Sequence, residues 1–281
     1  MDLLTERIRT GVAIIAFAAM LCLPGATVQA GGKVLLLATT TSTDNTGLLD
    51  YLAPRFTGDT GIELRWTAVG TGKALKLGQN CDVDVLLVHA PAAEKKYVAA
   101  GYGVDRRRVM YNDFVIIGPG RDPAGIKGRS VAEALPAIRR AGAVFVSRGD
   151  NSGTHKKELS LWSGAGADIP DKEPWYIQTG QGMLATINIA AERRGYTLTD
   201  RGTYIKYSAN HGGNPPLQIL VEGDSCLRNQ YSVMLVNPER CPGVKSALAR
   251  AFADWLVSPR AQKLIADFRL MGKQLFVPNA R

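Results

Sequence analysis

Short apolar, strand-like runs alternate with helical patterns along the chain after residue 30. Strand-like runs are predicted at 33–38, 62–69, 83–88, 114–117 and 143–146, with helices at 48–56, 92–100 and 131–140. This alternation indicates an α/β fold with parallel sheets covered by helices. In such sheets ligands bind beyond the carboxyl ends of the strands, so the loops that follow strands should carry the function.

The remaining pattern favours two lobes over a single sheet. Helices are predicted from Thr154 to Trp162 and at 183–194, strands around Tyr204, Leu217 and Tyr231, and two final helices at 244–256 and 259–268. Short segments near 110–114 and 220–231 lie where the chain could cross to a second lobe and return. We therefore expect lobe I to comprise 31–112 plus 222–281, and lobe II to comprise 113–221.

The first thirty residues are typical of a secretory signal peptide. Arg7 and Arg9 precede an uncharged run at 11–23, and Val28-Gln29-Ala30 is a small-residue cleavage pattern. The run is too short for a bilayer span of about 20 residues, so a retained membrane anchor is the less favoured alternative. Cleavage after Ala30 predicts an exported, soluble protein.

The net charge is +9, from 34 basic and 25 acidic residues. The leader carries two of each sign, so the excess lies in the folded part. It serves either solubility or the attraction of anions. Nucleic acid is a weaker candidate because the basic residues are dispersed and no aromatic-basic array stands out.

Three cysteines follow the leader: Cys81, Cys226 and Cys241. Cys226 and Cys241 could pair across a short loop and leave Cys81 free, although an odd number keeps the pairing open. The spacing fits no zinc-site pattern and the three histidines are scattered. No metal centre is therefore expected.

Hydroxyl residues cluster where the first strand should end. The run Thr39-Thr40-Thr41-Ser42-Thr43 precedes a helical pattern, with Asp44 as a candidate cap. Amides at a helix start lack intrahelical partners and bind anions. Five hydroxyls in a row exceed what capping needs, which favours ligand contact over an ordinary cap. After the next strand, Gly70-Thr71-Gly72-Lys73 resembles such an end, but a plain turn fits equally well and the Walker spacing is absent.

The segment from Ser147 to His155 is the strongest candidate for binding chemistry. Arg148 can offer a bidentate fork to an oxyanion, and Asp150 can cap the helix or hold that guanidinium. Ser152 and Thr154 add hydroxyls at the helix start. The alternative is a surface Arg–Asp pair beside a capped helix. A further helix start at 178–183 could present amides from the second lobe.

Other functional classes are less well supported. Asp150, Ser152 and His155 superficially resemble a catalytic set, yet three residues at one helix start rarely achieve triad geometry. The Gly-x-Ser-x-Gly elbow of hydrolases is absent from the sequence. We interpret the adhesion tripeptide Arg148-Gly149-Asp150 as coincidence. The chain is therefore not expected to be an enzyme.

Five segments together closely resemble the tungstate-binding periplasmic component of ABC transporters. The likeness covers nearly the whole chain after the leader, and the segments are specific as a set rather than singly. They are Thr39 to Leu48, Asp82 to Pro91, Met110 to Val115, Ser147 to His155 and Gly272 to Pro278.

The resemblance implies a two-lobed periplasmic binding protein of type II, with a mainly parallel, helix-covered sheet in each lobe and the oxyanion in the cleft between them. Family contacts fall on Thr39, Thr41, Ser42, Thr71, Arg148 and Thr154. The expected partners are tungstate and a membrane permease, for a monomer without a further cofactor.

Receptors for molybdate, sulfate or phosphate, and a secreted hydrolase, are the alternatives. A pocket that only donates hydrogen bonds would exclude protonated anions such as hydrogen phosphate. Tungstate and molybdate have almost the same size and charge, so only the family likeness separates them.

Overall fold

A computed structural model describes residues 33–280 of the protein. The predicted signal peptide and its cleavage site lie outside the described residues. The strands are β1 (Lys33–Thr40), β2 (Ile62–Val69), β3 (Val85–Val88), β4 (Gly103–Pro119), β5 (Phe145–Ser147), β6 (Tyr176–Gln178), β7 (Thr197–Asp200), β8 (Leu217–Val221), β9 (Arg228–Val236), β10 (Arg269–Leu270), β11 (Lys273–Gln274) and β12 (Val277–Pro278).

Helices follow most of these strands, as the alternation predicts. They are α1 (Thr41–Asp44), α2 (Leu48–Thr60), α3 (Thr71–Gln79), α4 (Pro91–Ala99), α5 (Val131–Ala141), α6 (Gly153–Gly164), α7 (Met183–Glu192), α8 (Arg201–Asn210), α9 (Ser246–Val257) and α10 (Pro259–Asp267), with a 3₁₀ turn at Ser225–Leu227. The structure confirms the α/β class, and the described residues contain no helix long and apolar enough to cross a membrane.

The main sheet has the order β12-β4-β9-β3-β1-β2, with β7 and β8 also paired to β4. β1 pairs in parallel with β2 and β3, and β5 pairs in parallel with β6. The long strands β4 and β9 run antiparallel to each other, and β9 runs antiparallel to β3. Each lobe thus contains parallel strand pairs, as the alternation of strands and helices predicts. The long antiparallel strands β4 and β9 connect the two lobes.

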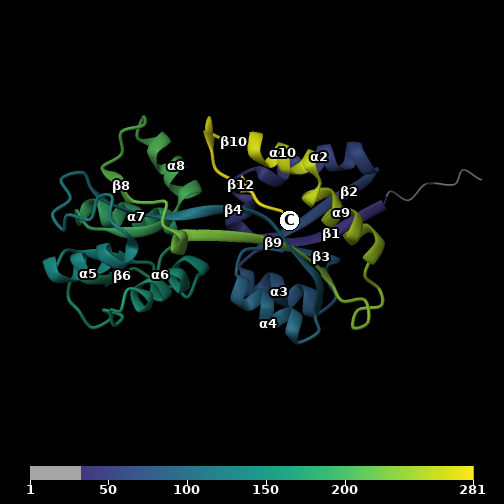
Figure 1. Ribbon diagram of the computed structural model, residues 1–281, viewed down its shortest axis with the longest axis horizontal. Coiled ribbons are helices and arrows are strands. Elements are labelled where there is room, and N and C mark those ends of the chain that lie inside the picture. The colour runs from purple at the N-terminus through teal and green to yellow at the C-terminus, as the bar shows by residue number, and fades with distance from the viewer. Residues whose placement is uncertain (1–32, 281) are drawn as a thin grey trace, which may run out of the picture. The chain divides into compact units, whose positions relative to one another are not determined.

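The elements fall into two groups joined by β4 and β9 (Figure 1), and each group has its own large set of buried side chains. One set, around β1, β2, β3, α2, α9 and α10, includes Leu37, Phe56 and Phe252. The other, around β5, α5 and α6, includes Phe145 and Trp162. We call the first lobe I and the second lobe II.

Strand β4 passes from lobe I to lobe II and changes its partner on the way. Up to Asp113 it pairs with β9, and from Phe114 it pairs with β7. The return crossing is made by β9, which runs beside β4 between the lobes in Figure 1. The lobes are therefore connected by extended strands rather than by a separate linker.

The prediction of a strand around Tyr204 is wrong. Tyr204 lies in α8, and the strand is the preceding segment β7. Asp200 ends the strand and caps the helix, because its Oδ1 accepts the Thr203 amide at 2.8 Å. The threonines and tyrosines nearby favour β-strands, so the sequence pattern predicted a strand where Asp200 starts a helix.

The pairing of Cys226 with Cys241 is also wrong. Cys81 is bonded to Cys241 with Cα atoms 5.5 Å apart, and Cys226 is free and exposed. The bond joins the end of α3 to the segment after β9, which is 160 residues away in sequence. Proximity in sequence suggested a short loop, but strand order brings β3 beside β9.

Candidate functional site

A cavity of about 1350 Å³ lies between the lobes, and it is lined by the segments that follow six strands. Lobe I contributes the turns after β1, β2 and β3, and lobe II contributes the turns after β5 and β7 and the first residues of α7, the helix that follows β6. Each turn leads into a helix, so the free amides of six helix starts lie around one space. This is the place that α/β topology reserves for ligands.

The hydroxyl run of lobe I divides between the cavity and the sheet. Thr40, Thr41 and Ser42 line the cavity, whereas Thr39 does not. The side chain of Thr39 is fully buried and its hydroxyl donates to the Leu87 carbonyl at 2.8 Å. Successive side chains of a strand point to opposite faces, so Thr39 points into the protein and does not join the hydroxyls at the cavity.

His89, which directly follows β3, forms hydrogen bonds with two of these hydroxyls. Its Nε2 lies 3.0 Å from both Thr40 Oγ1 and Ser42 Oγ, while Nδ1 lies 2.9 Å from Asn229 Oδ1. The Asn229 amide group donates to Asn112 at 2.8 Å, so its Oδ1 is left to accept from Nδ1. Burial lowers the pKa of His89. Neutral His89 thus accepts a hydroxyl hydrogen at Nε2.

Arg148 lies in the part of the cavity wall that lobe II provides. Its Nη2 donates to Asp150 Oδ2 at 2.5 Å and its Nε donates to the Gln181 carbonyl at 3.3 Å. The predicted segment 178–183 therefore supports the arginine, and Met183 lines the cavity. The Ser152 side chain caps α6 by accepting the His155 amide, and Thr154 lies in the first turn of this helix and lines the cavity.

The residues that superficially resemble a catalytic set bond to main-chain amides. Asp150 Oδ1 accepts the Ser152 amide at 3.1 Å, Ser152 Oγ accepts the His155 amide at 3.2 Å, and His155 Nδ1 accepts the amide of Asn151 at 3.0 Å. These bonds build a capped loop. They do not form the Asp–His–Ser relay that nucleophilic catalysis requires.

The lining of the cavity is strongly basic. Among the described residues that line it, one carboxylate, Asp200, faces six cationic side chains. Asp200 is engaged by the Thr203 amide and hydroxyl at 2.8 and 2.6 Å. The cations are Lys73, Arg148, Lys156, Lys157, Lys206 and Arg228. Such a cavity attracts small anions.

Sequence reasoning missed several of these residues. Thr40 belongs to the recognised hydroxyl run, and strand alternation relative to buried Leu37 could have distinguished it from Thr39. His89 directly follows an apolar strand, which is a usable signal for a site residue. Asn229, Lys206 and Arg228 carry no local signal, because they reach the cavity only through the way the lobes are joined.

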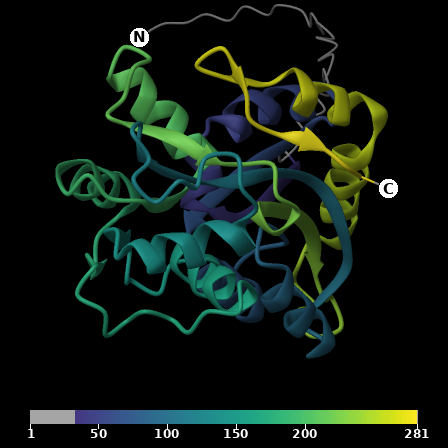
Figure 2. The ribbon, with the colours of Figure 1, turned by 60° about the vertical axis from the view of Figure 1, so that its left-hand side comes forward.

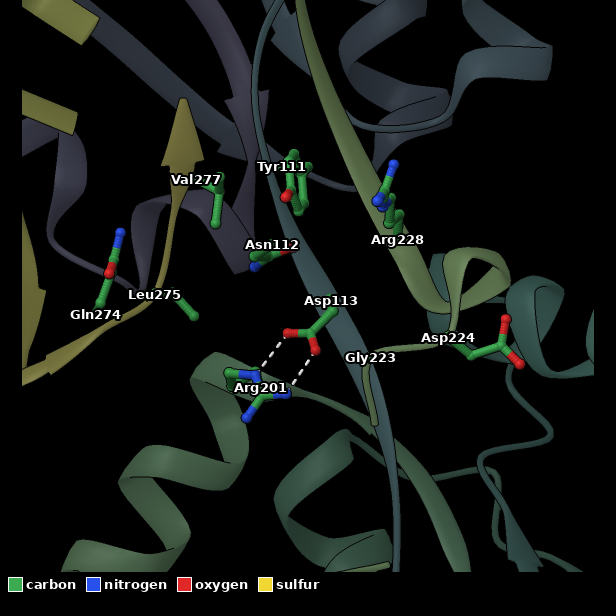
Figure 3. A pocket seen from close by; sticks show the side chains of 10 residues that line it. All are labelled: Tyr111, Asn112, Asp113, Arg201, Gly223, Asp224, Arg228, Gln274, Leu275 and Val277. Carbon is green, nitrogen blue, oxygen red and sulfur yellow. Dashed lines mark hydrogen bonds and ion pairs between the residues drawn. The ribbon is translucent and has the colours of Figure 1, made fainter. Parts of the chain in front are cut away.

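A second, smaller cavity of about 340 Å³ lies beside the crossing strands (Figure 3). Arg201 faces Asp113 there, with hydrogen bonds of 2.6 and 2.5 Å, and also contacts Glu222 at 2.7 Å. Hydrogen bonding to Asp113 raises the pKa of Arg201. Its charge is thus compensated, and it ties α8 to β4 rather than offering an anion site.

Strand-end turns from two lobes around one basic cavity define a two-lobed solute-binding protein, and comparison with known proteins agrees. The model of the PBP superfamily domain matches residues 27–260. The chain is 51% identical over 240 residues to the tungstate-binding protein TupA of Campylobacter jejuni, covering 85% of this chain and 89% of the relative. The chain therefore belongs to the PBP superfamily and, within it, to the TupA family.

Solved structures show the same relationship. The tungstate-binding protein TupA from Desulfovibrio alaskensis G20 is 69% identical, with a TM-score of 0.87 over 88% of this chain and 99% of that one. A tungstate ABC transporter structure from Geobacter sulfurreducens is 50% identical, with a TM-score of 0.73 over 84% of this chain and 99% of that one. The family resemblance found in the sequence is thereby confirmed.

Proposed function

We propose that this protein binds tungstate in the cavity between its lobes, in the periplasm, and delivers it to the permease of an ABC transporter. The observation that carries the proposal is the convergence of six helix starts, several hydroxyls and Arg148 on one basic cavity. The names of the TupA relatives supply the identity of the anion. The leader-like sequence at 1–30 supports export.

The energetics are sufficient for tight binding. A net gain of about 1.5–3 kcal/mol for each hydrogen bond to a charged group lets several donors reach the roughly 12 kcal/mol of nanomolar affinity. The cavity of about 1350 Å³ exceeds the roughly 300–1,000 Å³ of typical ligand pockets. A five-atom oxyanion can be surrounded there only if the lobes close, and the long strands β4 and β9 are the elements that would bend.

We propose that the ligand contacts are the six predicted residues that line the cavity: Thr41, Ser42, Thr71, Arg148, Ser152 and Thr154. We leave Thr39 out of the side-chain contacts, because its hydroxyl is bonded to Leu87. The main-chain amides of the helix starts would supply the remaining donors. This donor-rich lining favours fully deprotonated tetrahedral anions over hydrogen phosphate.

The lobe boundaries follow from the two sets of buried side chains. We propose that the first crossing lies at 112/113, as expected from the sequence, because Met110 packs in lobe I and Phe114 in lobe II. We propose that the second lies near residue 228 rather than 222, since Leu227 packs in lobe II and Tyr231 in lobe I. We also propose that the protein acts as a monomer, which light scattering of the purified protein would test, and that it carries no resident cofactor, which native mass spectrometry would test.

Anion competition on the protein without its leader tests the function. Tungstate should raise the melting temperature at lower concentration than molybdate, sulfate or phosphate does, because a ligand stabilises according to its concentration over Kd. Arg148→Ala should weaken tungstate binding at least tenfold in titration calorimetry. Arg139→Ala is the matched control, since Arg139 lies on α5 and pairs loosely with Glu173 at 3.8 Å.

The alternatives give different results in the same assays. Stabilisation by sulfate or phosphate but not by tungstate would make the protein a receptor for that anion. Ester hydrolysis abolished by Ser152→Ala would favour a hydrolase. Unchanged tungstate affinity in Arg148→Ala would remove Arg148 from the site.

A further inference from the structure

The charge of Arg148 is already balanced in the structure. Asp150 Oδ2 lies 2.5 Å from Arg148 Nη2, and both side chains are about four-fifths buried, with 19% and 20% of their surface exposed. The pair together carries no net charge. An anion with two negative charges, held beside this pair, still requires positive charge from elsewhere, because a buried charge without compensation is costly.

Lys206 is placed to provide that charge. It lies on α8, lines the cavity and is exposed. Within residues 33–280, no carboxylate forms an ion pair with it. Its Nζ donates instead to the main-chain carbonyl of Asn45, which directly follows α1 in lobe I. The ammonium thus reaches from lobe II to the wall that holds Thr41 and Ser42.

One face of α8 fixes this position against lobe I. Ile205 is 5% exposed and packs in the core of lobe I. A Cβ on Gly202 would lie 3.4 Å from Leu275, so the helix start sits close to the C-terminal segment, as Figures 1 and 2 show. Positions 202, 205 and 206 share a helix face. Lys206 therefore lies at the contact between the lobes and not at a freely moving surface.

Five of the cations that line the cavity have no carboxylate paired with them among residues 33–280, and Lys206 differs from the others by its bond to the Asn45 carbonyl of lobe I. We infer that Lys206 is therefore the cation that gives the site its preference for doubly charged anions, and that it couples the charge of the anion to closure of the lobes. The inference rests on the proposed function, since it concerns the same cavity. In the structure the Lys206 ammonium donates a hydrogen bond to the Asn45 carbonyl, which is a neutral acceptor. A dianion held by Thr41 and Ser42 is a stronger acceptor within the same region, and the ammonium would then hold α8 and α1 to it together.

Tungstate and perrhenate distinguish a charge role from a packing role, because both are tetrahedral oxyanions and they carry two charges and one. Coulomb energy scales with the charge of the ligand. Lys206→Met should weaken tungstate binding by about tenfold to a hundredfold, the range of one hydrogen bond to a charged group. The loss in log Kd for perrhenate should be about half as large. Lys206→Arg should restore most of the tungstate affinity.

Lys263→Met is the control, because Lys263 pairs with Asp267 at 2.9 Å on the surface of α10. It should leave both affinities within twofold. Equal losses for the two anions in Lys206→Met, or no loss, would overturn the inference while leaving the proposed function intact. A wild-type protein that binds neither anion would overturn the proposed function and this inference with it. If Lys206→Met fails to fold, Lys206→Gln makes the same comparison.

Discussion

The carboxylate of Asp150 holds the guanidinium of Arg148 at 2.5 Å and accepts the amide of Ser152 through its other oxygen at 3.1 Å. One side chain therefore fixes both the arginine and the helix start beside it. Burial alone would raise the pKa of Asp150, but the hydrogen bonds from Ser152 and the charge of Arg148 outweigh it and lower the pKa. Asp150 consequently stays ionised throughout the neutral range.

Asp150→Asn tests whether this support matters for binding. The asparagine keeps the size of the side chain but weakens the charge-assisted bond, so the arginine loses its fixed position. We expect tungstate affinity to fall about tenfold in titration calorimetry, the effect of roughly one such bond. The control is Asp171→Asn in the exposed loop before β6, which should not change the affinity. Tighter binding in Asp150→Asn would instead show that the carboxylate chiefly opposes the anion.

The neighbouring hydroxyls of β1 and α1 should respond differently to removal. Ser42→Ala should weaken tungstate binding by about tenfold, since its hydroxyl lines the cavity. Thr39→Val should lower the free energy of unfolding by about 1 kcal/mol or more, because a buried hydrogen bond to Leu87 is lost, and should leave affinity within twofold. Calorimetry and urea unfolding of both variants measure the two effects. A Thr39→Val variant with strongly reduced affinity would contradict the division.

The bond between Cys81 and Cys241 should contribute to the stability of lobe I. Replacing both residues by serine should cost about 2–5 kcal/mol of unfolding free energy, as for other native disulfides that close long loops. Reductant should lower the melting temperature of the wild type but not of the double variant. Cys226→Ser should stay within about 0.5 kcal/mol of the wild type, since Cys226 is exposed. A reductant-sensitive double variant would show that a different pair is bonded.

Local patterns predicted most of the fold. Apolar runs such as 62–69 and caps such as Ser258 before Pro259 specify strands and helix starts through nearby residues alone. The strand predicted around Tyr204 is wrong because the residues there favour β-structure, whereas the hydrogen bond from the Thr203 amide to Asp200 starts a helix. The disulfide failed because it depends on strand order, which local spacing does not contain.

The candidate site was predicted where it depends on strand ends and missed where it depends on the arrangement of lobes. Arg148, Ser152 and Thr71 each follow a strand, so their place at the cavity follows from α/β topology. Lys206 reaches lobe I only because α8 packs against it, a relationship between distant segments. Thr39 was expected at the cavity, but its neighbour Thr40 lies there instead, because one step along a strand moves the side chain to the other face of the sheet.

Glu158 is a buried carboxyl on α6, the helix that follows the Arg148 loop. It is 3% exposed on α6, and the hydroxyl of Tyr176 donates to its Oε1 at 2.5 Å. Burial raises the pKa of Glu158 to about 7, against an ordinary value of 4.5. The folded protein therefore retains a proton on Glu158 between about pH 4.5 and 7, where the unfolded chain has lost it.

This difference makes the folded state less stable as the pH rises through that window. The loss amounts to at most about 3.4 kcal/mol, since the two pKa values differ by roughly 2.5 units and each unit corresponds to about 1.36 kcal/mol. Glu158→Gln keeps the acceptor for Tyr176 and removes the titration, so the variant should gain stability relative to the wild type between pH 5 and pH 8. Urea unfolding at both pH values measures this, with exposed Glu192→Gln as the control. A constant difference between variant and wild type at the two pH values would show that Glu158 titrates as an ordinary carboxyl.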